Sequence, residues 1–200
     1  MSGLVSRDVA SWHRRVCPVT DWLLISGDLP PSPPEAVVKL GEWMDAGVTD
    51  IVDVRGEWSD EKFVHEQAPQ LRYHYLGTHD DGTTQDDAWY LDGLAALKSA
   101  RRHSGAVVMV HCHMGVNRGP SMAFAFLLDQ GWAPVDALNA IRAARPIAGV
   151  IYAHDAIRAV GRMQGKDELT LAHEHQSVEK WFDENQIDIA TIIRRIRSAT

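Results

Sequence analysis

The apolar residues of the chain fall into blocks with two different spacings, separated by polar stretches that contain Gly, Pro and Asp. Four short blocks alternate or are almost wholly apolar, which is typical of β-strands. The block at 106–110 is apolar at every position, as expected of a strand that is covered on both faces of a sheet. The predicted strands are residues 22–26, 50–55, 71–77 and 106–110.

Longer segments between these blocks carry apolar residues at helical spacing. Pro33, Pro120 and Pro134 stand where a helix can begin, because the first turn needs no backbone N–H partner. Gly47 and Gly131 are placed to end helices. The predicted helices are residues 33–46, 85–102, 120–130, 134–145 and 152–163. Because strands and helices alternate, the sequence predicts an α/β fold with a mostly parallel central sheet flanked by helices.

The two ends of the chain depart from this pattern. Residues 1–20 have no clear periodicity and are predicted to be a peripheral N-terminal arm, which leaves 21–163 as the main domain. Residues 164–200 are predicted to be an extension that is polar and linker-like at first and then an amphipathic helix at 177–198, broken near Asn185. The apolar face of this helix would either pack on the domain or mediate self-association or partner binding, and the sequence does not decide between them.

Composition narrows the class of protein. A net charge of −7 over 200 residues argues against broad binding of nucleic acid or of anionic membranes. No apolar run approaches the length of a membrane span, and the first fifteen residues lack the apolar core of a signal peptide. The two cysteines, Cys17 and Cys112, cannot form a disulfide framework. We therefore expect a cytoplasmic protein with reduced thiols, in which Cys17 is either an inert packed residue or a redox partner of Cys112.

The predicted strand at 106–110 leads directly into the chemically richest stretch of the chain. His111 and Cys112 follow it, and a loop with Gly115 ends at Arg118, before the helix that contains Pro120. Backbone N–H groups at such a helix start bind tetrahedral anions, and a guanidinium fits two phosphate oxygens. The same field stabilises a thiolate, so we expect the pKa of Cys112 to fall below about 8.5. Alternatively, Cys112 is a buried structural cysteine.

A metal site is a further alternative for this stretch. His111, Cys112 and His113 are candidate ligands, but a tetrahedral site needs a fourth ligand and is usually accompanied by a second cluster. The other close histidine pair, His173 and His175, lies far along the chain.

The pattern His-Cys-x-x-Gly-x-x-Arg at 111–118 resembles the active-site loop of cysteine-dependent protein phosphatases, and Arg-x-Pro-Ser at 118–121 is similar to their dual-specificity branch. The resemblance covers about 20–163, which makes 21–163 a phosphatase domain, and implies a dual-specificity phosphatase-like fold that needs no metal and no cofactor. It implies that Cys112 is the nucleophile, that Arg118 binds the phosphate, and that His111 supports Cys112 from behind. The implied substrate-binding loop consists of His113, Met114, Gly115, Val116, Asn117 and Arg118.

The resemblance also implies a general acid on a loop upstream of the central strand. Asp80 and Asp81 follow the strand at 71–77, and the match to the family pattern favours Asp80 as the catalytic residue. Alternatively, both merely shape a turn at Gly82. Asp86 and Asp87 are better explained as charges at a helix start.

One position departs from the family pattern. A Ser or Thr usually follows the Arg and helps the thiolate to leave in the second step, whereas this chain has Gly119, with Ser121 two residues further on. We therefore expect slow turnover and accumulation of phosphoenzyme. Arg145 and Pro146 match a late Arg-Pro in the family, which we interpret as the structural end of a helix.

The predicted function is hydrolysis of phosphomonoesters (phosphotyrosine, phosphoserine or phosphothreonine) through a phosphocysteine intermediate. The partner would be a phosphorylated protein or a small phosphomonoester, with phosphate or a similar oxyanion in the loop. The alternatives are a phosphate-recognition module with low turnover, a phosphatase of a non-protein substrate such as a phosphoinositide, and a rhodanese-like sulfur or arsenate enzyme. Those last enzymes lack an acid on a separate loop, so Asp80 distinguishes them.

Overall fold

The computed structural model describes residues 9–199 and contains one five-stranded sheet with the order β1-β2-β5-β3-β4. β1 is antiparallel to β2, and the other neighbours are parallel. This arrangement confirms the α/β fold with a mostly parallel sheet. The strands are β1 (Cys17–Pro18), β2 (Leu23–Ser26), β3 (Asp50–Arg55), β4 (Arg72–Thr78) and β5 (Val108–His111).

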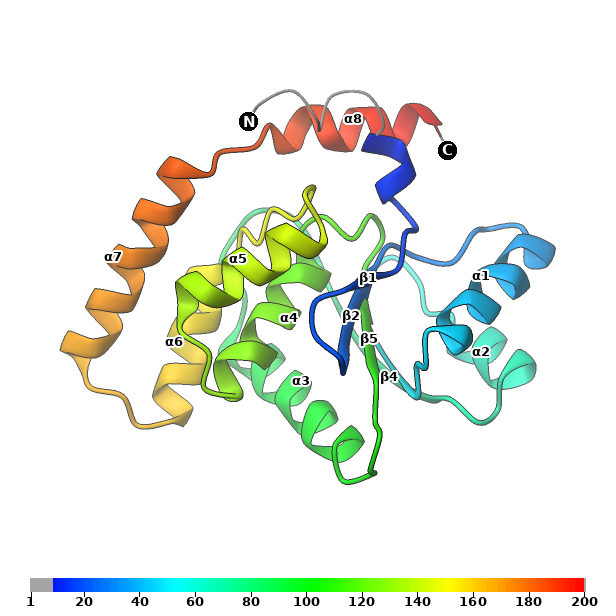
Figure 1. The fold of residues 1–200 in the computed structure, drawn as a ribbon, viewed down its shortest axis with the longest axis horizontal. Helices are drawn as coiled ribbons and strands as arrows, with labels where there is room; N and C mark the ends of the chain where they lie inside the picture. Colours follow the sequence, from blue (N-terminus) through cyan, green and yellow to red (C-terminus); the bar gives the residue numbers. More distant parts are fainter. Residues whose placement is uncertain (1–8, 200) are drawn as a thin grey trace.

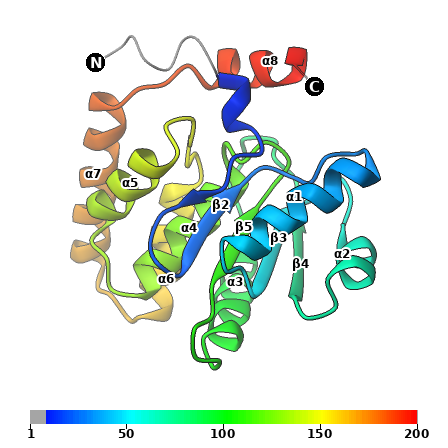
Figure 2. The same ribbon diagram turned by 45° about the vertical axis from the view of Figure 1, so that its right-hand side comes forward.

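Helices cover both faces of the sheet (Figures 1 and 2). On one face lie α1 (Pro33–Asp45) and α2 (Glu61–Gln67). The other helices described are η1 (Val9–Trp12), α3 (Asp87–Ala100), α4 (Arg118–Asp129), α5 (Pro134–Ala144), α6 (Ala153–Met163), α7 (Glu168–Glu184) and α8 (Ile189–Ala199). Of these, α3 and α4 pack directly on the second face, and α5, α6 and α7 continue the packing outward from α4.

The central strands are buried on both faces because their side chains alternate between two apolar cores. In β5, Val108 and Val110 join the core under α3 and α4, whereas Met109 joins the core under α1 and α2. The same alternation places Val52 and Ile51 of β3 in different cores. Because β3, β4 and β5 are parallel, their carboxyl ends meet at one edge of the sheet. Ligands bind at this edge in such folds.

Three segments differ from the sequence prediction. β1 lies within the N-terminal arm, and Cys17 pairs with Ile25 of β2, so part of the arm belongs to the sheet. α2 lies in the polar stretch between the strands predicted at 50–55 and 71–77, for which no full helix was predicted. α7 begins at Glu168, where a linker was predicted up to residue 177, because Asp167 caps it by accepting a hydrogen bond from the Thr170 N–H. Its widely spaced apolar residues obscured this helix in the sequence.

The predicted break near Asn185 is confirmed, since α7 ends at Glu184 and α8 begins at Ile189. α7 packs against α5 and α6, with Val178 and Trp181 buried. α8 lies across the top of the molecule in Figure 1, beside η1. Because the apolar faces of both helices are covered by the chain itself, self-association through 177–198 would have to use other side chains.

No helix among residues 9–199 has the length and apolar character needed to cross a bilayer.

Replacing Ile192 by Ala should test the docking of α8. The Ile192 side chain is buried in a cluster with Met114 and Val116, so its truncation leaves a cavity. We expect the free energy of unfolding to fall by about 2–3 kcal/mol, measured by urea denaturation. Arg194→Ala, on the exposed side of the same helix, should change it by less than about 0.5 kcal/mol. Equal effects of the two substitutions would mean that α8 is not docked in solution.

Candidate active site

The loop between β5 and α4 surrounds Cys112, which follows β5 directly and is 2% exposed. Gly115 has φ +62°, and a Cβ atom there would collide with the Arg145 guanidinium and the Ser26 carbonyl. Only glycine therefore fits the tight turn at this point of the loop.

Every carbonyl of the loop from His113 to Asn117 is bonded from outside the loop. The His113 carbonyl accepts from the Asp28 N–H and from His13 Nε2, both at 3.0 Å. Arg145 donates to the carbonyls of Met114 (3.0 Å) and Gly115 (2.5 Å). The carbonyls of Val116 and Asn117 accept from the N–H groups of Gly149 and Ser121.

The N–H groups of Gly115 and Gly119 face Cys112 and hydrogen-bond to its sulfur. N–H groups that converge at a helix N-terminus form an anion-binding nest. This arrangement fits the predicted binding of a phosphate group by the loop.

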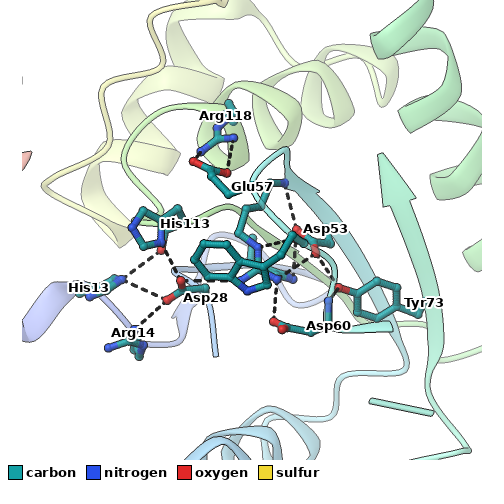
Figure 3. A network of polar contacts seen from close by, with 12 residues as sticks. His13, Arg14, Asp28, Asp53, Glu57, Asp60, Tyr73, His113 and Arg118 are labelled. Atoms are coloured by element: carbon teal, nitrogen blue, oxygen red, sulfur yellow. Dashed lines mark hydrogen bonds and ion pairs between the residues drawn. The ribbon is translucent and has the colours of Figure 1, made fainter. Parts of the chain in front are cut away.

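Arg118 is 3% exposed and extends from the first turn of α4 over the loop. Its two terminal nitrogens donate to the Glu57 carboxylate at 2.9 and 2.8 Å, as Figure 3 shows, and one also donates to the Thr78 carbonyl at 2.8 Å. Its Nε atom is buried and donates to no described residue, with Asp80 Oδ2 at 3.4 Å. The two terminal nitrogens therefore hold the guanidinium in place, and its Nε–H is left to donate a hydrogen bond to an oxyanion.

Asp80 lies beside Arg118 and is bound from two sides. Asn117 Nδ2 donates to Asp80 Oδ1 at 2.6 Å, and the Tyr152 hydroxyl donates to the same oxygen at 2.8 Å. Asp81 instead accepts hydrogen bonds from the N–H and hydroxyl of Thr83, which lower its pKa. Asp80 therefore lies next to Arg118, whereas Asp81 is turned to Thr83, and this position favours Asp80 over Asp81 as the acid.

The prediction that Cys112 is acidified does not hold for this arrangement. Burial raises the pKa of the thiol, and this effect outweighs the opposing influence of Arg118 and of the N–H groups of Gly119 and Gly115. Asp80 raises the pKa further. Arg118 itself is paired with Glu57 and lies 3.4 Å from Asp80.

His111 lies behind the loop, away from the cavity. It is fully buried, its ring lies 5.2 Å from that of Trp43, and Nε2 lies 3.6 Å from Asp53 Oδ1. Neither ring nitrogen has a hydrogen-bond partner among the described residues, and burial lowers the pKa of His111. Its neutral ring fills the space between β5 and α1.

The His113 side chain points towards Asp28 (Figure 3), with Nδ1 2.7 Å from Asp28 Oδ2. His13, Asp28 and His113 form the one group among the described residues whose spacing could hold a metal ion. However, Arg14 lies 3.0 Å and Arg55 3.7 Å from Asp28, so two guanidinium groups already compensate its charge. Although burial raises the pKa of Asp28, its bonds from His113 and His13 and the charge of Arg14 lower it overall. These contacts make the group an anchor for the loop.

Cys17 and Cys112 are both free and buried. Cys17 is in β1, and β2 lies between β1 and β5. Ile25 of β2 pairs with Cys17 on one side and with Val110 of β5 on the other. Two strand spacings amount to about 10 Å, which exceeds the reach of a disulfide. The Cys17 sulfur instead accepts a hydrogen bond from Arg145 Nη1 at 3.3 Å. In this conformation a redox partnership between the two cysteines is excluded.

A cavity of about 290 Å³ opens above Cys112. The loop contributes Cys112, His113, Met114, Val116, Asn117 and Arg118 to its lining. Asp80 and Glu57 close one side, and residues of α8 form another. The structure thus brings the sequence-predicted nucleophile, cation and acid together, whereas His111 and Gly115 act from outside the cavity.

Three contributors were not identified from the sequence as site residues. Arg145 was interpreted only as part of a helix end, but its buried guanidinium supports the loop from behind. Glu57 and Tyr152 lie in segments without a motif, and they contact Arg118 and Asp80. The arginine directly before Pro146, at the end of α5, was the one sequence feature that could have marked Arg145.

Comparisons with known proteins support the fold. No family model and no curated protein matches the chain. Among solved structures, human DUSP28 aligns with a TM-score of 0.59 and 21% identity over 74% of this chain and 95% of its own. PTPMT1 in complex with PI(5)P aligns with a TM-score of 0.59 and 18% identity, over 77% of this chain and 97% of its own. Tk-PTP in its active form gives 0.56 and 18%, over 74% and 96%. The chain therefore has the fold of dual-specificity phosphatases.

The influence of Asp80 on Cys112 can be measured by alkylation with iodoacetamide. The thiolate is the reactive form, so the alkylation rate rises as the pH passes the pKa of the thiol. Asp80→Asn removes a charge that raises this pKa, and the rise should move to lower pH. Arg118→Met should move it to higher pH. Asp81→Asn is the matched control and should leave the profile in place; a shift as large as that of Asp80→Asn would contradict the assignment.

Proposed function

We propose that this protein is a cysteine-dependent phosphatase that hydrolyses phosphomonoesters such as phosphotyrosine, phosphoserine or phosphothreonine through a phosphocysteine intermediate. The observation that carries the proposal is the convergence of four groups on one cavity. These are the Cys112 sulfur, the N–H groups of Gly115 and Gly119, the Arg118 Nε atom, which has no hydrogen-bond partner among the described residues, and the Asp80 carboxyl from a separate loop. The fold shared with dual-specificity phosphatases supports it.

In the first step, the Cys112 thiolate attacks phosphorus, so that an S–P bond forms as the P–O bond to the leaving group breaks. The loop N–H groups and Arg118 Nε hold the equatorial oxygens, where the charge of the transition state lies. Asp80 donates its proton to the departing oxygen, since an alkoxide or phenolate leaves poorly without one. His113, Met114, Gly115, Val116 and Asn117 form the binding loop, and His111 braces it from behind.

In the second step, water attacks the phosphocysteine and the S–P bond breaks. Asp80 accepts a proton from this water, and inorganic phosphate and the thiolate are released. The N–H groups of Gly115 and Gly119 stabilise the departing sulfur. No side-chain hydroxyl assists them at position 119, and the Ser121 hydroxyl lies 3.4 Å from Asn117 Oδ1 instead. This step is therefore the slow one.

Two other functions fit the cavity less well. A recognition module without turnover would have no use for a carboxyl held beside Arg118 by Asn117 and Tyr152. A rhodanese-like sulfur enzyme would likewise need no acid on a separate loop.

Hydrolysis of two aryl phosphates tests the proposal. Cys112→Ser should abolish hydrolysis of both p-nitrophenyl phosphate and phenyl phosphate, because its hydroxyl is a far weaker nucleophile. Asp80→Asn should lower kcat/KM, which reports phosphoryl transfer to Cys112, by about a hundredfold on phenyl phosphate, the poorer leaving group, and by less on p-nitrophenyl phosphate. Asp81→Asn is the matched control. Activity retained by Cys112→Ser would overturn the phosphatase proposal, and a larger effect at Asp81 would move the acid to that residue.

Gly119→Ser tests the slow second step. A Cβ atom at this position would lie 3.6 Å from the Cys112 sulfur with no severe clash, so a hydroxyl there can reach the sulfur. In a rapid-quench experiment, the wild type should release a burst of p-nitrophenol followed by a slow steady state. Gly119→Ser should raise the steady-state rate about tenfold, the value of one hydrogen bond to a developing charge. Gly119→Ala supplies the Cβ without the hydroxyl and should not; a wild type without a burst would sink this idea.

A further inference from the structure

The C-terminal helix α8 forms part of the wall of the candidate active site. Ile189, Ile193 and Arg197 line the cavity above Cys112, although they follow Cys112 by more than seventy residues in sequence. They occupy one side of α8, at spacings of four residues. Ile151, from the segment before α6, adds a further apolar side chain to the lining.

The position of this wall is fixed by packing on the loop itself. Ile192 and Ile196 are buried in a cluster that includes Met114 and Val116. Ile189 approaches the backbone so closely that a Cβ at Gly149 would lie 2.8 Å from its Cδ1 atom. Arg142 Nη1 donates to the Asn185 carbonyl at 2.9 Å and so holds the connection between α7 and α8. These contacts fix α8 as one wall of the site.

The charged side chains around the cavity differ in whether they have a partner within the protein. Arg118 is paired with Glu57, and Asp81 is bound by Thr83. Arg197 is exposed and makes no ion pair with any residue from 9 to 199. An unpaired cation at the outer end of an apolar wall attracts an anionic part of the substrate that lies beyond the part in contact with this wall.

A larger hollow of about 560 Å³, between the N-terminal arm and α1, offers no comparable site. Of its cations, Arg14 is paired with Asp28 and Lys39 with Glu42, and Arg15 stacks on the Trp12 ring.

We propose that α8 selects the substrate, with Ile189 and Ile193 packing on the aromatic ring of a phosphotyrosine and Arg197 binding an acidic residue next to it. This inference rests on the proposed phosphatase function and names its preferred substrate. An aromatic ring places flat apolar surface just outside the phosphate, where the isoleucines lie. Phosphoserine offers only a methylene group there. An inositol ring would lose water from its hydroxyls against side chains that cannot hydrogen-bond.

The experiment compares kcat/KM for phosphopeptides of equal length. The substrates are a phosphotyrosine peptide with acidic neighbours, the same peptide with neutral neighbours, and a phosphoserine peptide with acidic neighbours. A fourth probe is phosphatidylinositol 5-phosphate in phosphatidylcholine vesicles. The variants are Arg197→Gln and the double variant Ile189→Ala/Ile193→Ala. Arg194→Gln, with the same charge change on the same helix, and Leu169→Ala, an exposed residue of α7, are the matched controls.

We expect the wild type to prefer the acidic phosphotyrosine peptide. The double variant should lower kcat/KM for both phosphotyrosine peptides about tenfold and leave phosphoserine nearly unchanged. Arg197→Gln should lower it about threefold for the acidic phosphotyrosine peptide alone, and this loss should shrink at about 0.5 M salt. The control variants should match the wild type.

Three results would overturn the proposal. The first is an equal loss on phosphotyrosine and phosphoserine in the double variant, which would make α8 a support of the loop only. The second is an equal loss of kcat/KM on the acidic and the neutral phosphotyrosine peptide in Arg197→Gln. Because Arg197 is at the surface, this variant remains informative even if the double variant fails to fold. The third is preferred hydrolysis of the vesicles. If Cys112→Ser keeps the wild-type activity, the phosphatase function itself fails; if activity depends on Cys112 but no variant discriminates, only the role of α8 fails.

Discussion

The site depends on one constraint, namely that the loop after β5 must direct the N–H groups of Gly115 and Gly119 at Cys112 while the carbonyls of residues 113–117 bond to donors outside the loop. Outward carbonyls in a buried loop need donors, because an unsatisfied buried carbonyl costs about 1–3 kcal/mol. Arg145, which is fully buried, supplies the donors for Met114 and Gly115 and also bonds the carbonyls of His13 and Arg15. One side chain thus joins the loop to the N-terminal arm, and the phosphate cradle exists because its outer surface is satisfied.

This constraint draws distant segments into the site. His13 and Asp28 bind the carbonyl of His113, and Gly149 binds that of Val116, so the arm, the segment after β2 and the segment before α6 each hold one part of the loop. The arm is therefore not peripheral in function, although its sequence has no periodic pattern. α8 completes the enclosure by packing Ile192 and Ile196 against Met114 and Val116 of the loop.

The parts that could be predicted from the sequence are those fixed by local patterns. β3 was predicted with its observed bounds, and the break at Asn185 and the parallel sheet followed from periodicity. Cys112 and Arg118 share one short loop, so their spacing was visible. Glu57, Arg145 and Tyr152 meet this loop only through the fold, and a single carboxylate or guanidinium in a sequence does not indicate its partner. The acidity of Cys112 was overestimated because burial is a tertiary effect.

The environment of the sulfur links the two halves of the proposed reaction. The same groups that stabilise a thiolate as nucleophile also stabilise it as leaving group when the phosphocysteine breaks, since both steps pass through the same charge on sulfur. In this chain those groups are the N–H groups of Gly115 and Gly119 and the charge of Arg118, set against burial and Asp80. Because residue 119 is glycine, the usual hydroxyl is absent both when the thiolate attacks and when it leaves. A thiol with a raised pKa is a poorer leaving group than an acidified one, so burial and the missing hydroxyl act in the same direction and favour a long-lived phosphoenzyme.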